Sequence, residues 1–110
     1  SPPKPEVRVE FRFGVASEIS VLYPAAPERL KDHYDRLYTG VRAQFGAPQV
    51  DRAPLRAECA TSLANCLASG QRPKGAAWHW PAGSIELAPA LDGNRALIEL
   101  RYSRHEPLTQ

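Results

Sequence analysis

The chain has 110 residues, a length that fits one domain with a single hydrophobic core. Hydrophobic residues make up 43% of it and charged residues 24%, and no stretch approaches the ~18–20 apolar residues of a membrane-spanning helix. The formal net charge of +2 is too balanced to support nucleic-acid binding, so we expect no nucleic-acid partner, and no motif indicates a cofactor.

The sequence contains 2 cysteines and no methionine. A missing start residue indicates a processed chain or an excised domain, and a removed signal peptide would explain it. Frequent alanine and arginine favour a bacterial source. We therefore expect a periplasmic or secreted bacterial protein, with the cytoplasm as the alternative. The proline-rich residues 1–5 are expected to be a linker or tether, and a membrane contact is expected only through an anchor ahead of it.

Residues 6–13 alternate between apolar and charged side chains, which is the period of a strand with one buried face. The side chains expected to face the core are Val7, Val9, Phe11 and Phe13, and those expected to face solvent are Arg8, Glu10 and Arg12. A second strand is expected at residues 19–23, before Pro24.

The strongest helical pattern covers residues 27–45, and Gly46 and Pro48 end it. Its apolar stripe consists of Leu30, Tyr34, Leu37, Tyr38, Val41 and Phe45. Gly40 lies inside this helix, where it is expected to allow close approach to a sheet. Residues 49–54 are expected to be a connection, residues 55–68 a shorter helix, and residues 69–75 a polar loop.

The last third of the chain has the pattern of three strands, at residues 76–80, 84–91 and 94–103. The predicted fold class is α+β: a two-layer sandwich with this antiparallel meander and the N-terminal strands in one sheet. One long and one short helix are expected on one face of the sheet. The domain would cover residues 6–104, and residues 105–110 would form a tail.

Turn chemistry predicts the register of the meander. Asp92-Gly93 is a preferred dipeptide of two-residue hairpin turns, and the hairpin before it is expected to have an even-numbered loop. The resulting apolar pairs, with both tryptophans in the core, are Ile85–Leu100, Leu87–Ile98, Trp80–Ile85 and Trp78–Leu87.

The same register aligns His79, Glu86 and Glu99 across three neighbouring strands on the opposite face. One imidazole and two carboxylates at this spacing are suited to bind a divalent metal or to act as an acid/base pair. The competing interpretation is a solvated face whose charges are balanced by Arg101 and water.

Cys59 and Cys66 lie seven positions apart in the sequence. On one straight helix their Cα atoms would be about 10 Å apart, too far for a disulfide, which needs roughly 7 Å or less. Either the segment is one helix with two thiols, or the helix is broken and the cysteines are bridged. Export favours the bridge.

These features favour a non-enzymatic protein-interaction or structural module of the cell envelope, with another protein as its partner. Its candidate contact face contains Arg8, Glu10, Arg12 and Arg101. One alternative is a cytoplasmic, dimeric binding or chaperone-like domain. Another is a metal-dependent or acid/base enzyme that uses His79, Glu86 and Glu99.

The residues Phe45-Gly-Ala-Pro48, Trp80, Ile85-Glu-Leu87 and Leu100-Arg-Tyr102 form a pattern similar to one in small bacterial envelope proteins. These motifs are short and apolar. The resemblance implies the envelope as the compartment and assigns no functional residue.

Overall fold

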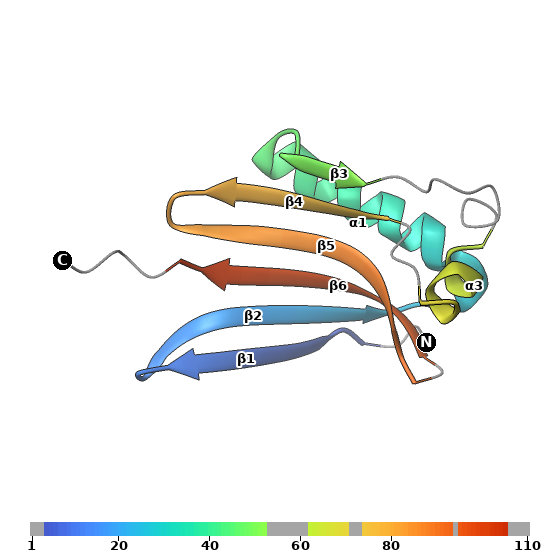
Figure 1. Cartoon of the computed structure of the whole chain (residues 1–110), viewed down its shortest axis with the longest axis horizontal. Coiled ribbons are helices and arrows are strands. Elements are labelled where there is room, and N and C mark those ends of the chain that lie inside the picture. The colour runs from blue at the N-terminus through green and yellow to red at the C-terminus, as the bar shows by residue number, and fades with distance from the viewer. Residues whose placement is uncertain (1–3, 53–61, 71–73, 94, 106–110) are drawn as a thin grey trace.

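The computed structural model describes residues 4–52, 62–70, 74–93 and 95–105, which form a six-stranded antiparallel sheet with two α-helices on one face (Figure 1). This architecture confirms the predicted α+β two-layer sandwich. Most of the predicted tether (residues 1–5) and tail (residues 105–110) lies outside the described residues.

The sheet has the strand order β1-β2-β6-β5-β4-β3. The elements in chain order are β1 (Glu6–Arg12), β2 (Val15–Pro24), a short 3-10 turn η1 (Pro27–Arg29), α1 (Leu30–Phe45), β3 (Val50–Arg52), α3 (Leu63–Ala68), β4 (Gly75–Trp80), β5 (Gly83–Asp92) and β6 (Arg95–Arg104). The N-terminal hairpin joins the meander because β6 pairs with β2.

The structure differs from the prediction in two segments between α1 and β4. β3 lies in a segment that was expected to be only a connection, and it pairs with β4 over three residues. A strand this short carries no readable alternation, so only its neighbour reveals it. The predicted helix over residues 55–68 is described only as α3, because residues 53–61 lie outside the described ranges.

The apolar stripe of α1 packs on the sheet as predicted. Leu30 and Tyr34 are completely buried, and they join a core that consists otherwise of Leu63, Ala76, Trp78, Ile85, Leu87, Ala96 and Ile98. α1 ends at Gly46, whose φ of 84° favours glycine. The Trp78 indole N–H donates a 2.8 Å hydrogen bond to the Gly46 carbonyl, so a core side chain of β4 holds the helix end.

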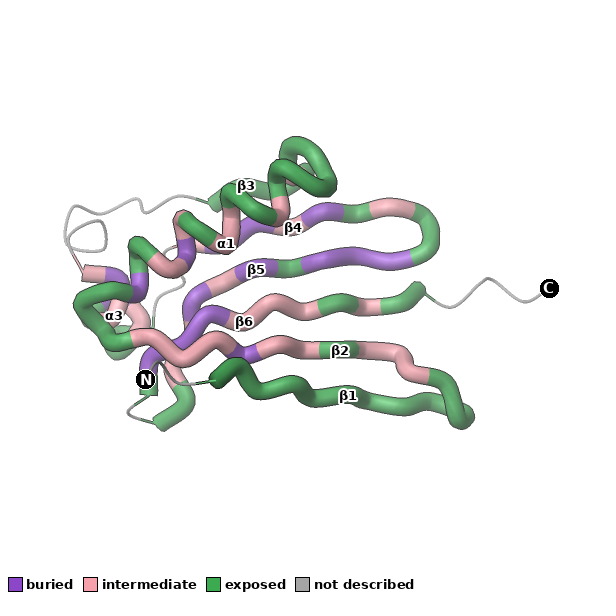
Figure 2. The backbone as a smooth tube through the Cα atoms, turned by 180° about the vertical axis from the view of Figure 1, so that it is seen from behind, coloured by how far each residue is buried: buried purple, intermediate pink, exposed green. Residues whose placement is uncertain are grey.

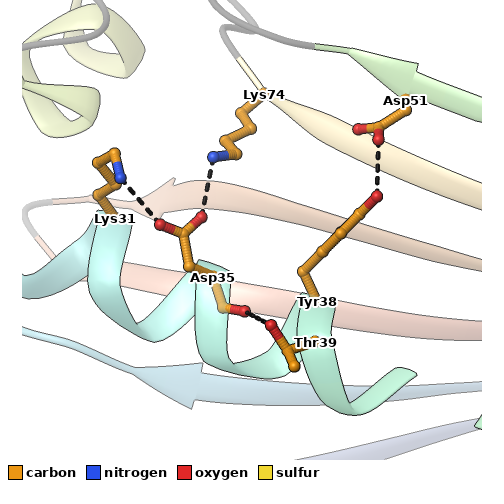
Figure 3. Close-up of polar contacts among 6 residues, drawn as sticks. All are labelled: Lys31, Asp35, Tyr38, Thr39, Asp51 and Lys74. Atoms are coloured by element: carbon orange, nitrogen blue, oxygen red, sulfur yellow. Dashed lines mark hydrogen bonds and ion pairs between the residues drawn. The ribbon is translucent and has the colours of Figure 1, made fainter. Parts of the chain in front are cut away.

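Polar contacts also connect α1 with β3 and with the segment just before β4 (Figure 3). The Tyr38 hydroxyl donates to Asp51 Oδ2 on β3 at 2.7 Å, and Lys74, just before β4, donates to Asp35 Oδ1 at 2.9 Å. Gly40, in contrast, is exposed, and a Cβ there would meet nothing within 4 Å. The expectation that Gly40 permits close helix–sheet approach was therefore wrong, because it lies on the solvent side of α1.

The predicted register of the meander was wrong by two residues in both hairpins. Trp78 pairs with Ile85 rather than with Leu87, and Leu87 pairs with Leu100 rather than with Ile98. Each residue keeps its predicted face, because a shift of two preserves the alternation.

The two turns explain the shift. The β4–β5 turn closes at the pair Trp80–Gly83, so Gly83 is a strand residue rather than a turn residue. A Cβ at Gly83 would lie 2.6 Å from the Ser103 carbonyl oxygen, and glycine is therefore required by the close approach of β6. The β5–β6 turn closes at Asp92–Arg95, which places Gly93 (φ 63°) first in the turn.

The expectation of a buried face on β1 was also wrong. All seven residues of β1 are exposed, including Val7, Val9 and Phe11. α1 packs against β5 and β6, and Figure 2 shows it over the β4–β5 side of the sheet, with β1 exposed along its whole length. The alternation of β1 predicted the strand correctly, but no described element covers its apolar side.

Candidate functional site

The predicted row of His79, Glu86 and Glu99 does not form. His79 faces Ser84, Glu86 faces Arg101, and Glu99 faces Ala88 and Leu22 on its two sides. The two-residue shift in each hairpin separates the three groups, so the alignment behind the metal and acid/base hypotheses was wrong. Within the described ranges, no group of three His, Cys, Asp or Glu residues is arranged to hold a metal ion.

Arg101 is the centre of the charged cluster on this open face, the side of the sheet away from α1. Its Nε lies 3.0 Å from Glu18 Oε1 and its Nη2 lies 2.8 Å from Glu99 Oε1, while Glu86 is its cross-strand partner. Burial lowers the pKa of Arg101, but the three carboxylates outweigh burial and raise that pKa above its ordinary value. Arg101 therefore stays cationic and compensates the carboxylates, as the solvated-face interpretation expected.

A hollow of about 590 Å³ lies on the same open face. Its lining includes the small residues Gly75, Ala77 and Ala88 and three charged residues of the Arg101 cluster, Glu86, Glu99 and Arg101. The lining also contains the charged side chains of Arg52 and Lys74. At this surface the ion pairs of Arg101 with Glu18 and Glu99 contribute little to stability.

The predicted contact face is partly assembled. Arg8 pairs with Ser20, and Ser20 pairs with Arg101, so Arg8 and Arg101 share the open face two strands apart. Glu10 and Arg12 follow at alternate positions of the same strand and therefore point to the same side. Arg8 Nε lies 3.5 Å from Glu6 Oε1, an exposed ion pair that contributes little to stability.

The helix side of β1, β2 and β6 carries an exposed apolar surface whose β1 residues the sequence had assigned to the core. We call it the β1 apolar face and define it by Val7 (61% exposed), Val9 (43%), Phe11 (67%), Ile19 (39%) and Tyr102 (39%). Val9 pairs with Ile19 and Ile19 with Tyr102, so the exposed side chains form a continuous row across three strands. Exposed apolar surface on this scale is typical of a binding site.

An aromatic cluster continues this face toward the end of α1. The rings of Phe45 and Trp80 stack at 6.0 Å between centroids, and Tyr102 packs edge-on against Trp80 at 6.2 Å. Both tryptophans were predicted to be core residues, which is confirmed for Trp78, while Trp80 is only half-buried.

β1 is also an edge of the sheet. In the described part of the chain it pairs with β2 alone, so the other side of its backbone carries unpaired N–H and C=O groups. Alternation in the sequence identified the apolar residues of β1 but not their exposure. The sequence did contain a signal for this exposure: it predicts only two helices, and two helices are too few to cover a wide sheet.

Cys66 is buried on α3 and is not a free thiol. Its predicted partner, Cys59, lies outside the described residues, so the Cys59–Cys66 bridge stays a prediction.

Comparison with protein-family models, curated proteins and solved structures found no match to this chain. None of the helices in the described ranges is long and apolar enough to cross a membrane. The candidate site therefore depends on the geometry of the chain alone.

Proposed function

We propose that this chain is a non-enzymatic protein-interaction module of the bacterial cell envelope, and that it binds its protein partner through strand β1 and the β1 apolar face. The observation that carries the proposal is an edge strand whose seven residues are all exposed although three of them are apolar. An exposed edge offers backbone hydrogen bonds to an added strand, and alternate side chains give the contact its specificity.

The open face supports a non-enzymatic role. Its carboxylates at Glu18 and Glu99 are engaged by Arg101, and Glu86 lies opposite the same guanidinium. Charges that neutralise one another at the surface of a sheet stabilise it weakly, and a carboxylate held by a guanidinium is a poor candidate for proton transfer.

Site-specific photocrosslinking tests the proposal. A photoreactive amino acid would replace Phe11 on the β1 apolar face, with Ala43, an exposed residue of α1, as the matched control position. We expect a discrete protein adduct from position 11 and none from position 43 in the cells that produce the protein. Adducts of the same mass from both positions, or none from position 11, would contradict the proposed surface.

The envelope assignment depends on the cysteines. In an oxidising compartment we propose a Cys59–Cys66 disulfide, whereas the cytoplasmic alternative predicts two reduced thiols. Thiol titration of the denatured protein, prepared from its native compartment with and without reductant, distinguishes the two: an equal thiol count in both samples would rule out the bridge.

A further inference from the structure

We propose that the partner of β1 is β1 of a second copy of this chain, paired antiparallel about a two-fold axis at Val9. This inference rests on the proposed function and names its partner. The two sheets would become one continuous sheet across the dimer, with the β1 apolar faces of both copies on the same side.

The outer edge of β1 is suited to such pairing because its backbone is regular. The pairing of β1 with β2 contains one irregularity, between Glu10 and Phe11. Glu10 pairs with Glu18 and Phe11 with Ala16, so the extra residue is Ser17 on β2. The bulge is therefore in the inner strand, and the backbone of β1 itself runs without an irregularity from Glu6 to Arg12.

The charged side chains of β1 complement those of a second, antiparallel β1 strand. Its open-face residues alternate in sign along the strand as Glu6, Arg8, Glu10 and Arg12. Antiparallel pairing centred on Val9 places Glu6 opposite Arg12 of the second copy and Arg8 opposite Glu10 of the second copy. The two-fold axis repeats both contacts, so every charge on this side of β1 faces an opposite charge.

Neighbouring registers lack this property. A centre at Arg8 places Glu6 opposite Glu10, and a centre at Glu10 places Arg8 opposite Arg12, so like charges meet in both. Centres at Val7 or Phe11 restore the complementarity but pair only three residues of β1. A one-residue shift puts apolar side chains beside charged ones on each face. The pattern therefore selects the register centred on Val9.

The same register also brings the apolar side chains of the two β1 strands together. Val9 would face Val9 of the second copy, and Val7 would face Phe11 of the second copy. These three side chains are 43–67% exposed in the single chain, and the pairing removes part of that apolar area from water. Val9 pairs with Ile19, and Ile19 pairs with Tyr102, so the apolar faces of the two copies would be continuous.

Charge reversal tests the register directly. One variant, Glu6→Arg with Glu10→Arg, makes the open side of β1 wholly basic, and a second, Arg8→Glu with Arg12→Glu, makes it wholly acidic. Sedimentation equilibrium of the wild type should show a concentration-dependent dimer. Each variant alone should dissociate at least about tenfold more readily, because four opposite-charge contacts become like-charge contacts. An equimolar mixture should recover the dimer as a heterodimer.

Matched controls carry the same changes of charge at exposed positions of η1 and α1: Glu28→Arg with Asp32→Arg, and Arg36→Glu with Arg42→Glu. These controls should dimerise like the wild type. A wild type that stays monomeric to several hundred micromolar would overturn the dimer, as would a dimer that both β1 variants leave intact. In either case the mass of the Phe11 crosslink decides the proposed function separately, because an adduct with a different protein would preserve it.

Discussion

Asp35 shows how single charges connect α1 with the segment that precedes β4. Lys31 and Lys74 each place Nζ 2.9 Å from one of its carboxylate oxygens (Figure 3). Burial raises the pKa of Asp35, but the hydrogen bonds from both lysines outweigh burial and lower that pKa below its ordinary value. Folding therefore favours the ionised carboxylate.

This shift predicts a pH-dependent effect of Asp35→Asn. At neutral pH the variant should lose up to about 1 kcal/mol of unfolding free energy, a small loss because the carboxylate is 44% exposed. Since the folded-state pKa is depressed, the contribution is present above the ordinary carboxyl pKa and is lost as the pH falls through the folded-state pKa. Urea unfolding at neutral and strongly acidic pH measures this, and a difference that persists in acid would refute the electrostatic cause.

Gly83 predicts a second residue-level effect. Gly83→Ala would drive a Cβ to within 2.6 Å of the Ser103 carbonyl oxygen, so β5 and β6 must separate locally. We expect a loss of roughly 1–3 kcal/mol in unfolding free energy, the usual cost of overpacking. A thermal or urea denaturation curve measures it, and an unchanged midpoint would show that the sheet yields there without cost.

For Gly40→Ala we expect the opposite effect, a gain in unfolding free energy. Position 40 is an exposed helical site with nothing within 4 Å of an added Cβ. Alanine should stabilise the protein by about 0.5–1 kcal/mol, because glycine loses more backbone entropy in a helix. Destabilisation at this position would mean that the solvent side of α1 is covered by something else.

At the level of elements, a hydrogen bond from a core side chain helps to attach the end of α1 to the sheet. Trp78, which is 2% exposed, donates its indole N–H to the carbonyl of Gly46 at the end of α1. The carbonyl at the end of α1 thus has an N–H donor from β4, and the buried indole has an acceptor for its N–H.

Trp78→Phe should accordingly destabilise the protein by about 1–3 kcal/mol, since it leaves the Gly46 carbonyl without its donor and removes part of the buried ring. Trp80→Phe is the control, because Trp80 is half-buried in the aromatic cluster and should cost less. Denaturation followed by far-UV circular dichroism compares them. Equal losses would show that the hydrogen bond to α1 is unimportant.

At the level of the whole molecule, the helix layer is narrower than the sheet. The radius of gyration of 14.9 Å exceeds the roughly 13 Å expected for a compact domain of this length. The extents of 48 × 29 × 26 Å describe an elongated body, and the β1–β2 hairpin lies beyond the cover of α1 (Figure 2). The molecule therefore exposes apolar surface at one side as a consequence of its architecture.

Val9→Thr combined with Phe11→Thr should separate folding from association. Both side chains are largely exposed in the single chain, so at low protein concentration the unfolding free energy should change by less than about 1 kcal/mol. Self-association should weaken at least about tenfold, as measured by light scattering across a concentration series. A large loss of stability with unchanged association would place these residues in a monomeric core instead.

Much of the fold was predictable because it depends on local periodicity. Alternation predicted β1, the apolar stripe predicted α1 from Leu30 to Phe45, and the face of each residue in the meander was correct. Turn dipeptides predicted hairpins but misplaced both turns, since a two-residue shift leaves every side chain on its own face. The alignment of residues across strands depends on the register and not on the alternation of apolar and polar residues. The two-residue shift therefore separates His79, Glu86 and Glu99.

The sequence by itself determined the main helix, the self-complementary charges of β1 and every described strand except β3, since each depends on residues close together in the chain. Only the tertiary structure decided that the apolar side of β1 is exposed. Burial depends on whether another layer covers a strand, and α1 packs against β5 and β6 instead. The 43% of hydrophobic residues thus divides between a buried core and an exposed face, a distinction that composition and periodicity do not contain.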